Sequence, residues 1–126
     1  MEKRPRVLVA EDESIIELDL KHSLEEWGFN VEATFRTGEE LLEFAQADDP
    51  EILIMDIFLQ GEMDGFEAAQ QVLKFNQIPV VFMTGQSKME KAANLQIGGI
   101  YELLKKPFSK EELKNALKKV YPDGPI

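Results

Sequence analysis

Acidic, hydroxyl and amine side chains each follow a short apolar run of the sequence. In chain order these residues are Glu11 and Asp12, then Asp56, then Thr84 and Gly85, and finally Lys106 and Pro107. In an open α/β sheet, ligands bind outside the carboxyl ends of the strands, near the point where the winding direction changes. If the apolar runs are parallel strands, three acids, one hydroxyl and one amine converge on one site.

Three carboxylates held within a few ångströms repel one another unless a cation neutralises them. Mg²⁺ prefers oxygen ligands and takes one or two protein carboxylates, several waters and a phosphate oxygen, a demand that Glu11, Asp12 and Asp56 fit. Zinc does not fit, because the chain has no cysteine and one histidine. The cluster therefore predicts a magnesium site.

A carboxylate beside Mg²⁺ and a lysine is a candidate nucleophile for phosphoryl transfer, since aspartyl phosphate is a known covalent intermediate. Thr84 could hydrogen-bond a transferred phosphoryl group, and Gly85 leaves its approach open. Successive strand side chains point to opposite faces, so Lys105 and Lys106 cannot both enter the site. A cis Lys106–Pro107 bond would hold Lys106 in place.

The apolar runs themselves predict the strands that position these residues. Three runs lack polar alternation and are typical of strands covered on both faces: 7–10, 52–55 and 80–83. The segment 31–35 alternates apolar and polar residues and predicts an edge strand, and 100–104 supplies a fifth strand.

Helical patterns lie between the strands. Apolar positions predict a first helix that ends near Trp27 and Gly28, a third from about Gly65 to Phe75, a weak fourth around 89–93 and a last one that includes 113–121. Capping boxes are expected at Thr37 with Glu40, Ser87 with Glu90, and Ser109 with Glu112. The alternation predicts a five-stranded parallel sheet, doubly wound, with helices on both faces. We expect one domain over residues 1–121, with 122–126 as a tail or the start of a linker.

Composition narrows the function classes. The formal charge of −10 repels phosphate backbones and anionic lipid, so we expect no direct nucleic-acid or membrane binding. The lack of cysteine suits a reducing compartment, and the basic N-terminus leads into an apolar run too short for a signal peptide or a membrane span. A cytoplasmic protein is therefore expected.

Taken together, these residues resemble the receiver domain of two-component response regulators over essentially the whole chain. The pieces that carry the resemblance are Glu11-Asp12, Asp56, Met63-Asp64-Gly65, Thr84-Gly85 and Lys106-Pro107-Phe108, in the right order at the right strand ends. The resemblance implies that Asp56 is the phosphoacceptor, with Thr84 and Lys106 contacting the phosphoryl oxygens. It further implies that Asp12 and Asp56 ligate Mg²⁺ directly, that Glu11 acts mainly through water, and that the backbone carbonyl of Phe58 is a further ligand.

The resemblance also implies partners. A sensor histidine kinase or phosphotransfer protein would donate the phosphoryl group, and the face formed by the fourth helix, fifth strand and last helix would engage an output domain, a partner protein or a second copy. The protein would transfer phosphate onto itself without being a turnover enzyme.

The chain departs from the family pattern at one position. The family commonly has an aromatic switch residue three positions before the site lysine, where this chain has Leu103, and Tyr101 lies two residues earlier on the same strand face.

Other functions remain open alternatives. An interaction module of the same fold that never uses phosphate would be favoured by loss of Asp12, Asp56 or Lys106, and all three are present. A flavin-binding relative would want a hydroxyl- or glycine-rich cradle after the first strand, where Glu11-Asp12-Glu13 would repel phosphate. An aspartyl-phosphate phosphatase usually has a second acid two residues beyond its nucleophile, a place held here by Phe58.

Overall fold

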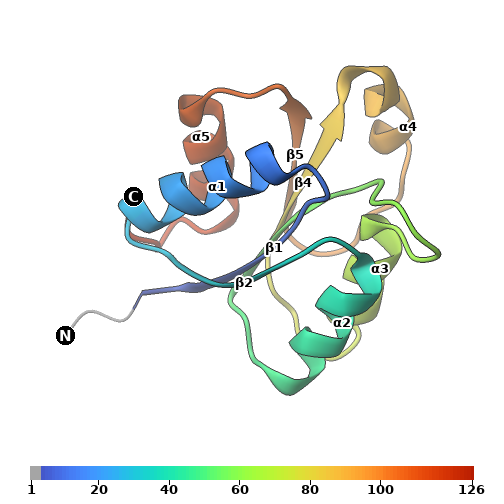
Figure 1. The fold of residues 1–126 in the computed structure, drawn as a ribbon, viewed down its shortest axis with the longest axis horizontal. Helices are drawn as coiled ribbons and strands as arrows, with labels where there is room; N and C mark the ends of the chain where they lie inside the picture. Colours follow the sequence, from blue (N-terminus) through green and yellow to red (C-terminus); the bar gives the residue numbers. More distant parts are fainter. Residues whose placement is uncertain (1–3) are drawn as a thin grey trace.

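A computed structural model describes residues 4–126 and contains one sheet of five parallel strands in the order β2-β1-β3-β4-β5 (Figure 1). The strands are β1 (Arg6–Ala10), β2 (Asn30–Phe35), β3 (Ile52–Asp56), β4 (Val80–Gly85) and β5 (Tyr101–Lys106). The helices are α1 (Ser14–Glu26), α2 (Gly38–Ala47), α3 (Gly65–Leu73), α4 (Met89–Ala93) and α5 (Lys110–Val120), with a 3₁₀ helix η1 (Gln86–Lys88) before α4.

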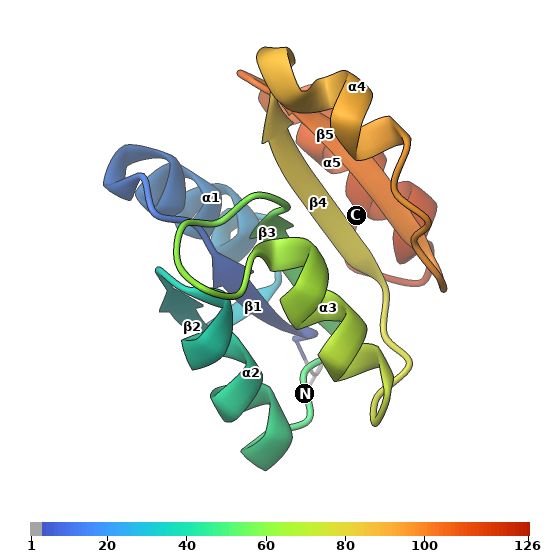
Figure 2. The ribbon, with the colours of Figure 1, turned by 90° about the vertical axis from the view of Figure 1, so that its right-hand side faces the viewer.

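Helices cover both faces of the sheet. One face packs against α1 and α5, and the other packs against α2, α3 and α4 (Figures 1 and 2). The first core includes Val7, Leu24 and Leu117, and the second includes Leu8, Leu41 and Val72. Neighbouring residues of β1 thus enter opposite cores, as the two-residue period of a strand requires. The predicted doubly wound α/β sandwich is confirmed.

Burial separates the central strands from the edge strands. The apolar residues of β1, β3 and β4 are nearly all excluded from solvent, whereas β2 and β5 each have one buried residue and consist mainly of half-buried or exposed ones. The edge position predicted for residues 31–35 is confirmed. The fifth strand begins one residue later and ends two residues beyond the predicted range, so that Lys106 is its last residue.

The capping predictions have mixed outcomes. Ser109 and Glu112 form the reciprocal capping box of α5. Thr37 accepts the N–H of Glu40, but the Glu40 carboxylate accepts the Thr37 hydroxyl instead of a backbone N–H. The prediction for Ser87 is wrong, because η1 occupies that turn and α4 begins at Met89 without a side-chain cap. The third helix ends at Leu73, two residues before the predicted Phe75.

The last five residues pack back onto the domain. Pro125 lies close to Gly28, which follows α1 with a φ of +100°, and Ile126 packs against the core shared by α1 and α5. A positive φ after a helix favours glycine.

Just before the tail, the Tyr121 hydroxyl donates to Glu51 at 3.0 Å. Burial, together with the Glu51 carboxylate, raises the pKa of Tyr121. Within residues 4–126, no helix has both the length and the apolar character needed to cross a bilayer.

Candidate functional site

The carboxyl ends of β1 and β3 bring three carboxylates together at one edge of the sheet. Glu11 and Asp12 directly follow β1, and Asp56 ends β3, the strand that pairs with β1. One oxygen from each of the three lies within 4.8 Å of the others. The carboxylate cluster predicted from the sequence is thus present in the geometry.

Glu11 is fully buried and bonded on both of its oxygens. Its Oε2 accepts the backbone N–H groups of Asp12 (2.9 Å) and Glu13 (3.2 Å), and its Oε1 lies 3.0 Å from the Nζ of Lys106. Burial raises the pKa of Glu11, and the hydrogen bond and charge of Lys106 oppose that rise only in part. The side chain therefore orders the loop after β1 while adding a negative charge beneath the site.

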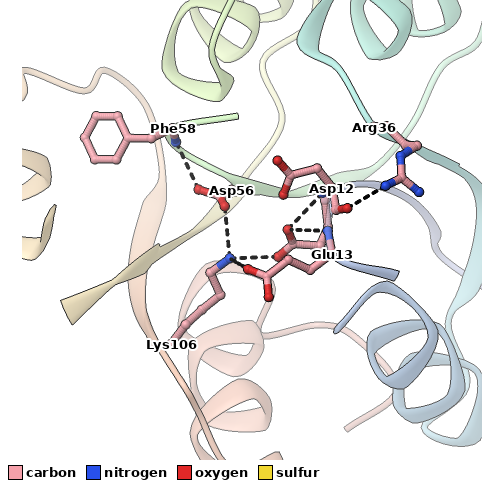
Figure 3. Close-up of polar contacts among 7 residues, drawn as sticks. Asp12, Glu13, Arg36, Asp56, Phe58 and Lys106 are labelled. Atoms are coloured by element: carbon pink, nitrogen blue, oxygen red, sulfur yellow. Dashed lines mark hydrogen bonds and ion pairs between the residues drawn. The ribbon is translucent and has the colours of Figure 1, made fainter. Parts of the chain in front are cut away.

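Lys106 neutralises part of this charge from the end of β5. Its Nζ lies 2.9 Å from Asp56 Oδ2, 3.0 Å from Glu11 Oε1 and 3.3 Å from Glu13 Oε1 (Figure 3). Burial of the ammonium lowers the pKa of Lys106, but the hydrogen bonds and charges of Asp56 and Glu11 outweigh that effect and raise it. Lys106 is therefore a permanent cation at the site. The Lys106–Pro107 bond is cis.

Asp56 is held from two sides. Its Oδ1 accepts the backbone N–H of Phe58 at 3.0 Å, while Oδ2 accepts Lys106. The side chain of Asp56 is 14% exposed, and it lines a cavity of about 200 Å³ together with Thr84, Gly85 and Lys106. A carboxylate that is oriented, paired and still accessible is suited to act as a nucleophile.

Gly65 allows the start of α3 to approach the backbone of Asp56. A Cβ at this position would lie 2.0 Å from the Asp56 carbonyl oxygen. The next residue, Phe66, donates its N–H to the Ile57 carbonyl at 3.0 Å. Gly65 belongs to the Met63-Asp64-Gly65 motif, and its close approach to Asp56 fixes the end of β3 against a helix.

Thr84 and Gly85 end β4, and both line the cavity at Asp56. Thr84 is buried, and its Oγ1 has no hydrogen-bond partner among residues 4–126. A buried hydroxyl without a partner is costly, so a group that accepts its proton would be stabilised here. A Cβ at Gly85 would meet nothing within 4 Å, which leaves the approach to the cavity open.

The two other predicted switch residues lie away from the cluster. Tyr101 is at the opposite end of β5 from Lys106, and its ring lies edge-on to Phe82 at 6.5 Å. Leu103 is half-buried and packs against the core covered by α2, α3 and α4. Neither side chain lines the cavity at Asp56, and their role in switching remains a prediction.

Three residues at the site were not predicted to contribute to it. Glu13 contacts Lys106, and its spacing of two from Glu11 was the available signal. Arg36, which follows β2, donates from Nη2 to the Asp12 carbonyl at 2.8 Å (Figure 3). Its Nη1 donates to Ser14 Oγ at 3.3 Å. Lys88 of η1 lines the cavity. The contacts of Arg36 and Lys88 depend on the relative placement of loops, for which the sequence carries no local signal.

Comparison with known proteins supports this geometry. A sequence model of the response regulator receiver domain matches residues 7–118. The transcriptional regulatory protein PdtaR of Mycobacterium tuberculosis is 33% identical over 112 residues, which are 89% of this chain and 54% of PdtaR. This chain therefore spans about half the length of that relative.

Solved structures agree in fold. The response regulator PhyR from Brucella abortus superposes with a TM-score of 0.82 at 26% identity, covering 94% of this chain and 48% of PhyR. The signal receiver domain of a modulated diguanylate cyclase from Desulfovibrio desulfuricans has a TM-score of 0.79 at 27% identity and covers 96% of both chains. With the match over residues 7–118, these likenesses show that the chain belongs to the response regulator receiver domain family, the phosphoacceptor signalling module of two-component systems.

Proposed function

We propose that Asp56 is the phosphoacceptor of this receiver domain and that the reaction depends on Mg²⁺. The observation that carries the proposal is the position of the Asp56 carboxylate, 2.9 Å from the Lys106 ammonium and grouped with Glu11 and Asp12. The donor is a phosphohistidine on a sensor histidine kinase or a phosphotransfer protein. An oxygen of Asp56 forms a bond to phosphorus as the bond from phosphorus to the imidazole nitrogen breaks, and the electron pair stays with the imidazole.

The chain's own residues support each part of that transfer. Lys106 and the Phe58 N–H orient the Asp56 carboxylate. Lys106 then offers its charge to the oxygens of the transferred group, and Thr84 offers its hydroxyl, which has no hydrogen-bond partner within residues 4–126. Gly85 leaves room for that group to enter. The protein modifies itself in this scheme and does not turn over a substrate.

The donor set fits a hard divalent cation. Asp12 and Asp56 would hold Mg²⁺ directly, Glu11 would act through water, and the backbone carbonyl of Phe58 would complete the protein ligands. When bound, Mg²⁺ supplies positive charge that neutralises the carboxylates and the phosphoryl oxygens. Arg36 fixes the loop that carries Asp12 through the Asp12 carbonyl.

The downstream partner would bind the face formed by α4, β5 and α5. Thr84 and Lys106 are near the carboxyl ends of β4 and β5, so a change in their contacts can reach that face directly. The partner is an output domain, another protein or a second copy of this chain. We further propose that residues 1–121 form the receiver domain, that 122–126 are a tail or the start of a linker, and that the protein acts in the cytoplasm.

The direct test is phosphorylation by a small donor. Wild-type protein incubated with acetyl phosphate and Mg²⁺ should gain one phosphate by intact mass, and Asp56→Asn should gain none. Asp19→Asn, which removes an exposed acid of α1, is the matched control and should react as the wild type does. An adduct on Asp56→Asn would mean another acceptor, and no adduct on any protein would favour the phosphate-independent interaction module.

Mg²⁺ should stabilise the folded protein through the carboxylate cluster. At a free concentration about ten times the dissociation constant, the expected gain in the free energy of unfolding is about 1.4 kcal/mol. Denaturant titration followed by the fluorescence of Trp27, the single tryptophan, measures it. Asp12→Asn should lose most of the gain. An equal Mg²⁺ response in both proteins would place the ion elsewhere.

A further inference from the structure

Two lysine ammonium groups lie over the ring of Phe58. The Nζ of Lys88, at the end of η1, is 5.4 Å from the ring centroid, and the Nζ of Lys91, in α4, is 5.1 Å from it. Both lysines are exposed, while Phe58 is half-buried in the loop after β3. The negative face of an aromatic ring attracts cations, so the ring gathers two like charges that would otherwise repel each other.

Lys88 stands at the mouth of the cavity at Asp56, and Lys91 adjoins it through the Phe58 ring. Phe58 and Lys88 line the same cavity of about 200 Å³ as Asp56 and Lys106. Phe58 is tied to the acceptor through its N–H, and its ring is directed away from Lys106 (Figure 3). The Lys88 side chain therefore shares a cavity with Asp56, and within residues 4–126 neither ammonium group forms an ion pair with the Asp56 carboxylate.

Neither lysine is neutralised by a carboxylate. Within the described part of the chain, the ion pairs of the site all belong to Lys106, and Lys88 and Lys91 form none. Their charges remain available to an anion that enters the cavity. A cation that is not paired with a carboxylate and lies at the rim of an acceptor site is placed to attract the incoming anion.

The approaching group needs such attraction. Glu13 and Asp56 line the cavity, and Glu11 and Asp12 adjoin Asp56, whereas Lys106 is the cation in contact with them. With one Mg²⁺ bound, the four carboxylates are matched by the charges of Mg²⁺, Lys106 and Arg36, which adjoins Asp12, so the site itself has no net charge to attract a dianionic phosphoryl donor. Cations at the rim supply that attraction.

We propose that Lys88 and Lys91 form a cationic rim that draws the dianionic phosphoryl group toward Asp56, with the Phe58 ring holding both ammonium groups at the mouth of the cavity. This rests on the proposed role of Asp56 as phosphoacceptor. The rim adds to Thr84 and Lys106 two residues that act before the transfer, from η1 and α4. It also joins the loop after β3 to α4 through one aromatic side chain.

The test measures the initial rate of phosphorylation by acetyl phosphate at low and high ionic strength. The single variants Lys88→Gln and Lys91→Gln should each be about two- to threefold slower than wild type at low salt, and the double variant about fivefold slower. The difference should shrink at high salt, where screening weakens the attraction. Lys74→Gln, an exposed lysine at the end of α3, is the matched control and should react at the wild-type rate.

The outcomes separate the two proposals. If wild type gains phosphate on Asp56 and the double variant reacts equally fast at low salt, the rim is wrong and the acceptor stands. If wild type gains no phosphate, the assignment of Asp56 as the acceptor is wrong.

The variant Phe58→Leu tests whether the aromatic ring holds the two ammonium groups. It keeps an apolar side chain, and the effect of Lys88→Gln should be smaller in that background, whereas an unchanged effect would overturn the holding role of Phe58.

Discussion

Replacing Lys106 with methionine is expected to lower the free energy of unfolding by about 3 kcal/mol in Mg²⁺-free buffer at neutral pH. The methionine fills similar space but leaves Glu11, Asp56 and Glu13 without the ammonium that each contacts within 3.3 Å. The loss of stability is largest at Glu11, because its carboxylate is fully buried. Denaturant titration followed by Trp27 fluorescence measures the change, and saturating Mg²⁺ should restore part of the stability.

The adjacent lysine provides the control. Lys105 is exposed and forms no ion pair among residues 4–126, so Lys105→Met should change stability by less than about 0.5 kcal/mol. If Lys106→Met is as stable as wild type without Mg²⁺, the carboxylates do not depend on the ammonium, and the electrostatic description of the site is wrong.

The pH dependence of the Lys106→Met effect has a definite sign. Burial raises the pKa of Glu11 in the folded protein, although Lys106 opposes the rise. A carboxyl group with a raised folded pKa stabilises the fold below the ordinary value of 4.5 and loses that contribution as pH rises through the folded value. Without Lys106 the pKa of Glu11 rises further. The stability difference between Lys106→Met and wild type should therefore be small below pH 4.5 and grow toward neutral pH.

Gly65→Ala is expected to cost about 3 kcal/mol, although alanine ordinarily favours a helix over glycine. The added methyl carbon would lie 2.0 Å from the carbonyl oxygen of Asp56 and 3.1 Å from the Cα of Ile57. Both are backbone atoms, so the start of α3 must separate from the end of β3. The same separation displaces the Asp56 carboxylate, and phosphorylation by acetyl phosphate should slow as well.

Gly98→Ala is the matched control for this substitution. A Cβ at Gly98 would meet nothing within 4 Å, and its φ is not in the left-handed region. The variant should be as stable as wild type or slightly more stable. If Gly65→Ala is as stable as wild type, α3 can shift at little cost. The close approach of Gly65 to the Asp56 backbone would then not be needed to hold α3 against β3.

The sheet and the grouping of the acids were predictable because both follow from short-range patterns. Unbroken apolar runs mark buried parallel strands, and parallel strands deliver the residues after them to one edge. That reasoning alone placed Asp12, Asp56 and Lys106 together, although they are far apart in sequence. The residue that ends each strand was less certain, as β5 shows, because edge strands alternate and their ends depend on neighbours.

Other features depend on distances between elements that no local pattern encodes. The close approach at Gly65 exists only once α3 is docked on β3. The predicted capping box at Ser87 is wrong for the same reason. Ser87 lies inside the 3₁₀ helix η1, and α4 begins only at Met89. The stacking of Lys88 and Lys91 on Phe58 joins η1 and α4 to the loop after β3.

The packing of residues 122–126 determines where a fluorophore or affinity tag attached at Ile126 would lie. Pro125 lies against Gly28, just before β2, and Asn30 of β2 pairs with Arg6 at the start of β1. This is the pole of the sheet opposite to Asp56, which ends β3. A fluorophore or affinity tag joined through Ile126 therefore starts at the far end of the molecule. Protein immobilised through such a tag would keep the cavity at Asp56 facing the solution.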